Sequence, residues 1–213
     1  MSSQGIVLPL HKEIERDSSA RDQQERFRVE DGELVELAVA GDRAAESRLA
    51  RKHVPEVARV VARLLGSHDE VDDLVQETFL SAFEQLHNLE KPTAFRGWIL
   101  RIAINKTRNV IRKRRMLRLI GLDRGTPDAT LEALAHDHLS EELLIELAAV
   151  TAVLERLPVE SRIAWLLRHI EGHSLRDVSR LCGCSLATAK RRLAKAQERV
   201  MNAVDKEVLS RGY

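Results

Sequence analysis

Aromatic residues, turn-forming residues and cysteines are all scarce in this chain of 213 residues. Aromatic residues make up 3% of it, and it has 10 glycines, 5 prolines and 2 cysteines. The small number of turn formers favours an all-α protein. The hydrophobic fraction of 44% is large enough for a hydrophobic core. Two cysteines do not make a disulfide framework, so a reducing compartment, the cytoplasm, is expected.

Long apolar runs are absent as well. No stretch of about 18 apolar residues occurs, which predicts a protein without membrane insertion. The N-terminus lacks a basic start and its apolar stretch is short, so no signal peptide is predicted. The sequence also has no glycine-rich phosphate loop, no HExxH zinc motif and no nucleophile elbow. These absences argue against an enzyme, and no cofactor is predicted.

The net charge of +1 conceals an uneven distribution of charge along the chain. Residues 66–90 contain seven acids and no lysine or arginine, whereas residues 96–118 contain nine basic residues and no acid. Acids return at residues 119–150, with seven against one arginine. Nine basic residues on one helix repel one another unless a polyanion is near, so residues 96–118 indicate nucleic acid as a partner.

Hydrophobic periodicity divides the chain into two small helical domains. Residues 1–30 are polar with weak periodicity, and we interpret them as a mobile tail or a loosely attached helix. Helical spacing runs through residues 31–118, with a separate helix expected at 54–65. Residues 119–140 combine glycine, proline and acids, which predicts a flexible acidic linker. The second domain is expected at residues 141–213.

The segment 71–86 has two contrasting faces. Its apolar positions recur at helical spacing and are Val71, Leu74, Val75, Thr78, Phe79, Ala82, Phe83 and Leu86. The opposite face carries acids together with one leucine, Leu80. A solvated helix, a carboxylate metal site and a partner-binding surface are the possible interpretations. Carboxylates on one convex face do not converge around an ion, so no metal site is predicted and a docking surface is favoured.

A basic helix is expected roughly from residue 94 to 115, after a loop that contains Pro92. One of its sides is apolar and is expected to pack in the core. A polar stripe follows the same helical spacing and comprises Arg101, Asn105, Arg108 and Arg112. Trp98 is expected in the core, with one ring edge free to stack on an unpaired base.

The second domain contains a short helix, a glycine turn and a long basic helix in that order. Ser174 and Ser185 stand at the expected N-caps, and Gly183 lies between the two helices. This order is typical of a helix-turn-helix, whose second helix enters the major groove of DNA. A solvated basic helix face is the alternative. Zinc requires four ligands, so Cys182 is expected to pack as a small apolar residue instead.

Taken in order, these motifs resemble the extracytoplasmic-function (ECF) sigma factors of bacterial RNA polymerase. The resemblance covers roughly residues 31–204 and rests on "DDLVQETFLSAF", "FRGWILRIAINKTRNVIRKRR" and "LERLPVESRIAWLLRHIEGHSLRDVSRLCGCSLATAKRRLAKAQERV". It implies a non-enzymatic subunit that binds core RNA polymerase and directs transcription initiation at specific promoters. The two helical domains then correspond to sigma regions two and four.

The resemblance also implies where each partner binds. The β′ clamp helices of core polymerase are expected on Asp72, Asp73, Gln76, Glu77 and Leu80. The minus-ten promoter element is expected on Trp98, Arg101, Asn105, Arg108 and Arg112. The minus-thirty-five element is expected on Ser185, Thr188, Lys190, Arg191, Arg192 and Lys195. The β flap of polymerase and an anti-sigma factor are further expected partners.

Two other classes of protein are weighed against this interpretation. A stand-alone helix-turn-helix regulator would bind DNA with the C-terminal domain alone, and it has no need for an acidic face with Leu80 in a separate domain. A nuclease would use the carboxylates of that face, but it requires a convergent pocket that one convex helix does not supply. Departures from the family at Ala189, Arg191 and Asn109 leave the promoter sequence open.

Overall fold

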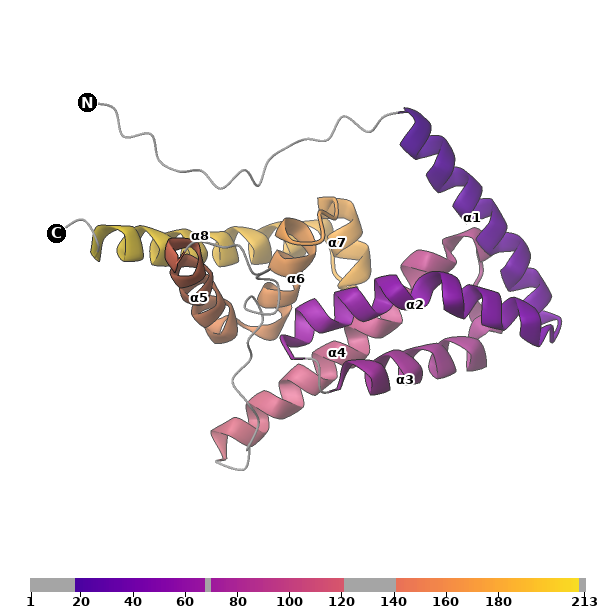
Figure 1. Cartoon of the computed structure of the whole chain (residues 1–213), viewed down its shortest axis with the longest axis horizontal. Helices are drawn as coiled ribbons and strands as arrows, with labels where there is room; N and C mark the ends of the chain where they lie inside the picture. Colours follow the sequence, from indigo (N-terminus) through magenta and orange to yellow (C-terminus); the bar gives the residue numbers. More distant parts are fainter. Residues whose placement is uncertain (1–17, 68–69, 121–140, 211–213) are drawn as a thin grey trace.

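A computed structural model of the chain describes residues 18–67, 70–120 and 141–210, with side chains for 28–67, 70–120 and 148–203. These residues form helices and no strands (Figure 1), which confirms the all-α prediction. The α-helices are α1 (Ser18–Val39), α2 (Arg43–Leu65), α3 (Val71–Glu84), α4 (Phe95–Leu119), α5 (Glu141–Arg156), α6 (Val159–His169), α7 (Leu175–Leu181) and α8 (Leu186–Ser210). Two 3-10 turns, η1 (Leu86–Asn88) and η2 (Pro92–Ala94), connect α3 to α4.

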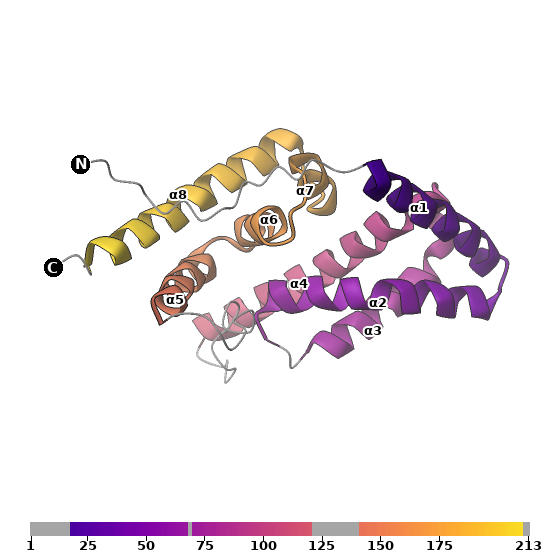
Figure 2. The same cartoon turned by 45° about the horizontal axis from the view of Figure 1, so that its top comes forward.

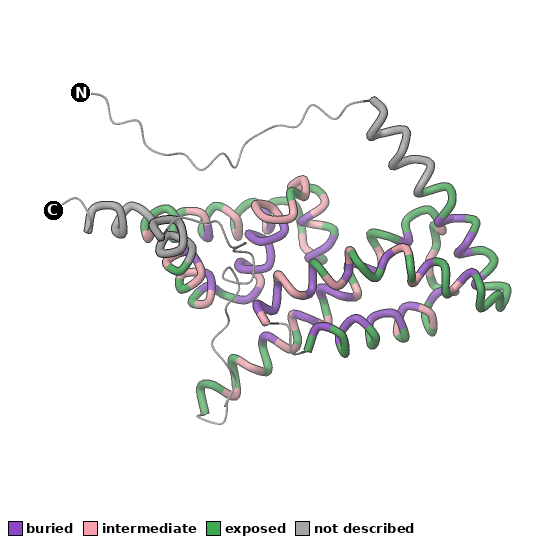
Figure 3. The backbone as a smooth tube through the Cα atoms, in the orientation of Figure 1, coloured by how far each residue is buried: buried purple, intermediate pink, exposed green. Residues whose placement is uncertain are grey.

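The first domain is a bundle of α1 to α4, in which α2, α3 and α4 pack on one another and α1 lies across α2 and η2. Their buried faces turn inward along the whole length of the bundle (Figure 3). Its fully buried side chains come largely from α2 and α4, and they include Leu49, Val57, Leu64, Phe95, Ile99 and Ile104. This core fixes which faces of α3 and α4 are left to meet partners.

The helix α2 is continuous, so the expectation of a separate helix at 54–65 is wrong. It begins at the N-cap Asp42, whose Oδ1 accepts hydrogen bonds from two first-turn amides at 2.7 and 3.3 Å. It ends at Gly66, whose φ of 75° is left-handed. Pro55 lies inside and removes one backbone donor. Leu49 and Val57 are both fully buried, so packing on either side of the proline keeps the helix in one piece.

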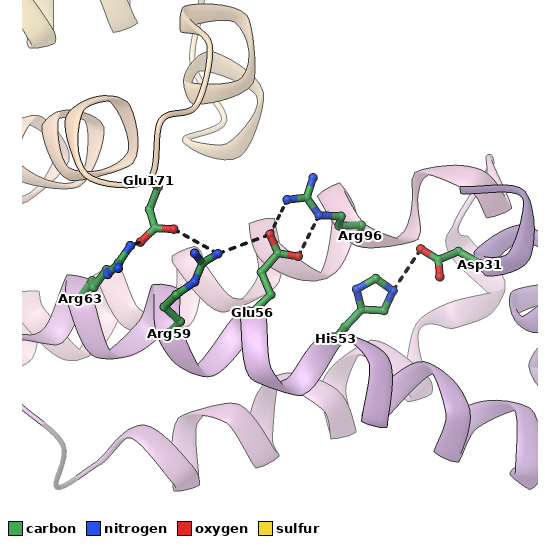
Figure 4. A network of polar contacts seen from close by, with 7 residues as sticks. All are labelled: Asp31, His53, Glu56, Arg59, Arg63, Arg96 and Glu171. Atoms are coloured by element: carbon green, nitrogen blue, oxygen red, sulfur yellow. Dashed lines mark hydrogen bonds and ion pairs between the residues drawn. The ribbon is translucent and has the colours of Figure 1, made fainter. Parts of the chain in front are cut away.

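The helix α1 begins at Ser18, inside the segment for which the sequence left a tail and a loosely attached helix open. Of these two alternatives, residues 18–30 form the helix. Residues 1–17 lie outside the described part of the chain. Asp31 attaches α1 to α2, because its carboxylate lies 3.0 Å from His53 Nε2 (Figure 4) and 2.8 Å from Lys52 Nζ. The Asp31 side chain is 2% exposed, so this is a buried polar anchor.

The second domain consists of α5 to α8, with α8 packed along α5, α6 and α7. Its buried side chains include Leu154, Ile163, Leu167, Val178, Ala189 and Ala196. Residues 121–140, which hold most of the predicted linker, lie outside the described residues, and α4 extends to Leu119. In the described part of the chain, no helix is both long enough and apolar enough to cross a membrane.

The second domain rests on the first through α6 and α7, which contact α4, and through α6, which also contacts α2. Figures 1 and 2 show α3 on the opposite side of the first domain from α6 and α7. The helix α4 therefore contacts the second domain, whereas α3 lies on the side of the first domain that faces away from it.

Candidate protein and nucleic-acid interfaces

The residues predicted to bind polymerase lie together on one exposed face of α3. They are Asp72, Asp73, Gln76, Glu77 and Leu80, and every one of them is exposed. Leu80 is 57% exposed, whereas Leu74 and Phe79 on the other face are 5% and 6% exposed. The core of α3 is therefore complete without Leu80, whose side chain faces solvent.

The acids on this face differ in their surroundings. Asp72 and Asp73 stand in the first turn of α3, where the helix dipole favours negative charge. Glu77 lies 3.6 Å from Lys106 Nζ of α4, so part of its charge is balanced within the domain. The face is thus most negative at its N-terminal end, where Asp72 and Asp73 stand.

The described residues include no group of three or more histidine, cysteine or acidic side chains placed to hold a metal ion.

The predicted minus-ten residues share one face of α4, because they follow each other at helical steps of three and four. They are Trp98, Arg101, Asn105, Arg108 and Arg112. Trp98 is half-buried and packs against Phe95, with ring centroids 6.2 Å apart and ring planes at 47°. Asn105 Oδ1 accepts a hydrogen bond from Arg108 Nη1 at 2.8 Å. The indole therefore packs partly against the core, on the same face of α4 as the three arginines.

This face of α4 is in contact with the second domain. Arg108 Nη2 donates to the carbonyl oxygen of Cys182 at 3.2 Å, and Arg112 forms an ion pair with Glu160 of α6. The guanidinium of Arg101 lies next to Gly183, since a Cβ built on that glycine would be 3.5 Å from Arg101 Nη2. Three of the five predicted minus-ten residues therefore touch the second domain, at the turn between α7 and α8 and at the start of α6.

The turn between α7 and α8 follows the predicted pattern. Ser174 Oγ accepts from the backbone N–H of Asp177 at 3.1 Å and caps α7. Ser185 Oγ accepts from the N–H of Thr188 at 3.2 Å and caps α8. Gly183 has φ of 63°, a left-handed value that glycine adopts without strain. The two caps and the glycine set the direction in which α8 leaves the turn.

Most of the predicted minus-thirty-five residues share a face of α8. Thr188 is three residues from Arg191 and four from Arg192, and Lys195 is four and three residues from the same two arginines. Arg191 and Lys195 are exposed, whereas Thr188 and Arg192 are half-buried and border the side that holds the buried Ala189 and Ala196. Ser185 joins them at the start, where its hydroxyl is 2.9 Å from that of Thr188. Lys190 is exposed but stands two positions from both Thr188 and Arg192, so it points to another side of the helix.

Sequence reasoning missed the acid that joins the domains. Glu171, in the loop between α6 and α7, reaches down between two arginines of α2 (Figure 4). Its Oε1 is 2.5 Å from Arg63 Nη1 and its Oε2 is 3.4 Å from Arg59 Nη2. The Glu171 side chain is 3% exposed. No local pattern reveals this pairing, because 108 residues separate Glu171 from Arg63.

Glu160 lies between the two predicted DNA-binding helices. Burial acts to raise the pKa of its carboxyl, but the hydrogen bond and charge of Arg112 and the charge of Arg192 lower it below the usual range. Glu160 is therefore ionised at neutral pH, forms an ion pair with Arg112 of α4 and lies near enough to Arg192 of α8 for that charge to lower its pKa. Both of these arginines belong to predicted promoter-binding sets.

Cys182 packs as the sequence predicts. Its side chain is buried, and burial together with Cys184 raises the pKa of its thiol to about 11. A thiol with so high a pKa is a weak nucleophile and a poor metal ligand, because both roles require the thiolate. Its contribution to the interface is its backbone carbonyl, which accepts from Arg108.

Two family models match the chain. Sigma-70 region 2 matches residues 49–116, and Sigma-70, region 4 matches residues 147–200. The ECF RNA polymerase sigma-E factor of Escherichia coli K12 is 29% identical over 188 residues, covering 80% of this chain and 92% of that protein. The RNA polymerase sigma-H factor of Pseudomonas aeruginosa is 28% identical over 190 residues, covering 82% and 94%.

Solved structures with a similar fold include CnrH in complex with the cytosolic domain of CnrY, with a TM-score of 0.59 and 25% identity over 83% of this chain and 98% of that one. RpoE from Bartonella quintana, in complex with the anti-sigma factor NepR, has a TM-score of 0.54 and 23% identity over 75% and 96%. Both likenesses extend over most of the chain, across the two domains described above.

Proposed function

Since this chain belongs to the sigma-70 family, as an ECF sigma factor that directs promoter-specific transcription initiation, we propose which of its surfaces performs each step. The exposed face of α3 binds core RNA polymerase. The stripe on α4 binds the minus-ten element, and the exposed face of α8 binds the minus-thirty-five element.

The observation that carries the α3 assignment is the exposure of Leu80 beside Asp73 and Glu77 on a helix whose core face is already filled. A surface of one leucine with acids on both sides suits a partner that presents an apolar pocket among basic groups. The same acids disfavour DNA on this side of the domain, because like charges repel.

The α4 assignment is supported by the kind of groups that its stripe presents. Arginines neutralise phosphates, and an indole edge stacks on an unpaired base. Residues 96–118 hold nine basic residues and no acid, so a polyanion lowers the free energy of this helix.

The α8 assignment is supported by its position after a capped turn and by the exposed side chains of Ser185 and Arg191, beside the half-buried Thr188 and Arg192. Arg191 and Arg192 each have the donor geometry that reads guanine in the major groove. Lys190 faces another side, so we assign it a phosphate contact or none. No described residue supports contact with the β flap of polymerase, and that partner stays a prediction of the resemblance.

Run-off transcription tests the proposal. Purified protein and core polymerase are incubated with the DNA upstream of the protein's own gene, and initiation at a defined start identifies both promoter elements. Asp73→Lys is expected to abolish it by weakening core binding, while Glu36→Lys on the exposed side of α1 makes the same charge change and leaves it intact. DNA binding without polymerase-dependent initiation would instead identify a stand-alone regulator.

We further propose that an anti-sigma factor inhibits this protein, supported by the likeness to RpoE, which was solved with the anti-sigma factor NepR. An inhibitor of this class blocks run-off transcription when it is added before core polymerase. A candidate that inhibits equally at every order of addition acts on polymerase or DNA instead.

A further inference from the structure

The helix α1 lies beside the start of the proposed minus-ten stripe, although it is outside residues 49–116, which the Sigma-70 region 2 model matches. It packs on α2, on the turn η2 and on α4. The turn η2 ends at Ala94, and Trp98 follows about one helical turn later in α4. The way in which α1 sits on η2 therefore acts directly on the segment that leads into Trp98.

Gly32 of α1 packs directly against η2. A Cβ built on Gly32 would lie 3.1 Å from Thr93 Cγ2 and 3.9 Å from Pro92 Cβ. Carbon atoms of neighbouring side chains ordinarily lie about 3.5–4.0 Å apart, so a side chain on Gly32 would have to push Thr93 away by about 0.4–0.9 Å. Gly32 is buried inside a helix, where glycine is less favourable than alanine. The close packing of η2 explains why a glycine occupies this position.

The residue before Gly32 holds α1 in place. The Asp31 carboxylate lies 3.0 Å from His53 Nε2 (Figure 4) and 2.8 Å from Lys52 Nζ, both of α2. Asp31 is 2% exposed and His53 is 4% exposed. A buried carboxylate is stable only with such partners, so α1 has little freedom to slide along α2. Pressure from a larger residue at Gly32 is therefore passed on to η2 and is not relieved by a movement of α1.

A series of ring contacts connects the same anchor with Trp98. The ring centroids of His53 and Phe95 are 5.3 Å apart, and those of Phe95 and Trp98 are 6.2 Å apart. Phe95 is fully buried and is the first residue of α4. Because buried side chains are close-packed, the position of each ring depends on its neighbours. The place of Trp98 is thus set from two sides, by η2 and by the rings, and α1 contacts both.

We propose that α1 is part of the minus-ten site, with Gly32 as a positioning residue that sets the place of Trp98 through η2. This rests on the proposed minus-ten role of the α4 stripe. Gly32 is buried, so it acts through Thr93 and does not contact DNA itself. A binding group has to be held within about 0.5 Å of its productive place, and the shift that a Cβ on Gly32 requires is of that size.

The substitution Gly32→Ala tests the proposal, together with two substitutions of the residue that the new methyl group would touch. Thr93→Ser removes Cγ2, the atom 3.1 Å from the added Cβ, and keeps the hydroxyl. Thr93→Val keeps a methyl group in that place and removes the hydroxyl. The effect of Gly32→Ala is therefore expected to disappear with Thr93→Ser and to persist with Thr93→Val. Glu36→Ala, on the exposed side of α1, is the matched control.

The first measurement follows Trp98 itself in the full chain. The protein has two tryptophans, so a sample made with fluorotryptophan gives two fluorine NMR signals, and Trp165 in the second domain is the internal reference. Gly32→Ala is expected to shift the signal of Trp98 alone, and the addition of Thr93→Ser is expected to return it. Circular dichroism verifies that helicity is kept. A Trp98 signal that Gly32→Ala leaves unchanged would overturn the positioning role.

The second measurement is binding of the holoenzyme to a fluorescent fork-junction DNA that carries the minus-ten element mapped by run-off transcription. Gly32→Ala is expected to weaken this binding about fivefold, within the range of couplings between residues in contact. The double variant with Thr93→Ser is expected to bind like Thr93→Ser alone, and the double variant with Thr93→Val is expected to stay weak. Affinity for core polymerase is expected to be unchanged, because the Leu80 face belongs to α3, which packs on α2 and α4.

The remaining outcomes also decide the proposal. A shifted Trp98 signal without loss of DNA affinity, or a loss that Thr93→Ser does not reverse, would exclude α1 from the minus-ten site. If Gly32→Ala does not fold, Asp31→Asn takes its place, because it loosens α1 without adding a heavy atom, and an unchanged Trp98 signal and DNA affinity would then contradict the proposal. If the wild-type holoenzyme does not bind the fork junction, the proposed function fails instead, and the fluorine signals still decide whether α1 positions Trp98.

Discussion

Replacing Leu80 by alanine is the most direct test of the polymerase-binding face. The side chain is 57% exposed in the free protein, and a docking partner would cover that part. Fully burying a leucine contributes about 1.5–3 kcal/mol, so covering the exposed 57% contributes about 0.9–1.7 kcal/mol. Leu80→Ala is therefore expected to weaken core polymerase binding by about 4- to 16-fold, as an upper range because alanine keeps one methyl group.

The assay is a titration of fluorescently labelled protein with core polymerase, followed by anisotropy. The matched control is Leu37→Ala, because Leu37 on α1 is 49% exposed and lies outside the proposed interface. Neither substitution touches the core, so the free energy of unfolding is expected to change by less than about 0.5 kcal/mol for each. An affinity for Leu80→Ala within twofold of wild type, or an equal loss for Leu37→Ala, would refute the assignment.

Three further changes test other parts of the structure. Arg192→Ala is expected to weaken binding to DNA with the upstream element by about 1–3 kcal/mol in anisotropy titrations, whereas an equal loss on unrelated DNA would make it a phosphate contact. Burial acts to raise the pKa of Asp31, but hydrogen bonds from His53 and Lys52 lower it, so its stabilisation is full above about pH 4 and is lost as the pH falls through the lowered value. Asp31→Asn is expected to cost about 3 kcal/mol at pH 7 in urea unfolding and progressively less as the pH falls through the lowered pKa of Asp31, and a cost that does not fall with pH would contradict the ionic anchor. Because the pKa of Cys182 is raised to about 11, iodoacetamide is expected to label it slowly at pH 8 until urea is added, and rapid native labelling would exclude its burial.

The helices with strong periodicity were predictable because their own residues decide which face is buried. The spacing in α3 predicts Leu74, Val75 and Phe79 inside and Leu80 outside, and the structure has them so. The caps of α7 and α8 were predictable for the same reason, since Ser174 and Ser185 bond amides only three residues away.

Other features depend on the tertiary structure. Proline ordinarily marks a helix boundary, and the sequence does not reveal that buried neighbours on both sides of Pro55 hold α2 continuous. The pairing of Arg112 with Glu160 joins residues 48 positions apart, and the many arginines and acids of the chain offer many equally plausible pairs. The sequence predicted DNA as the partner of the α4 arginines and did not reveal that the second domain contacts them as well.

The contacts of the α4 arginines with the second domain explain how so basic a helix is stable without DNA. Nine basic residues without an acid destabilise residues 96–118 unless negative charge or acceptors lie near, and the free protein has no DNA. In the structure, Glu160 and Glu70 pair with arginines of α4, and two backbone carbonyls accept from two others. Three of these four contacts come from the second domain. A helix rich in basic residues is thus stabilised in part by an acid and two backbone carbonyls of the other domain.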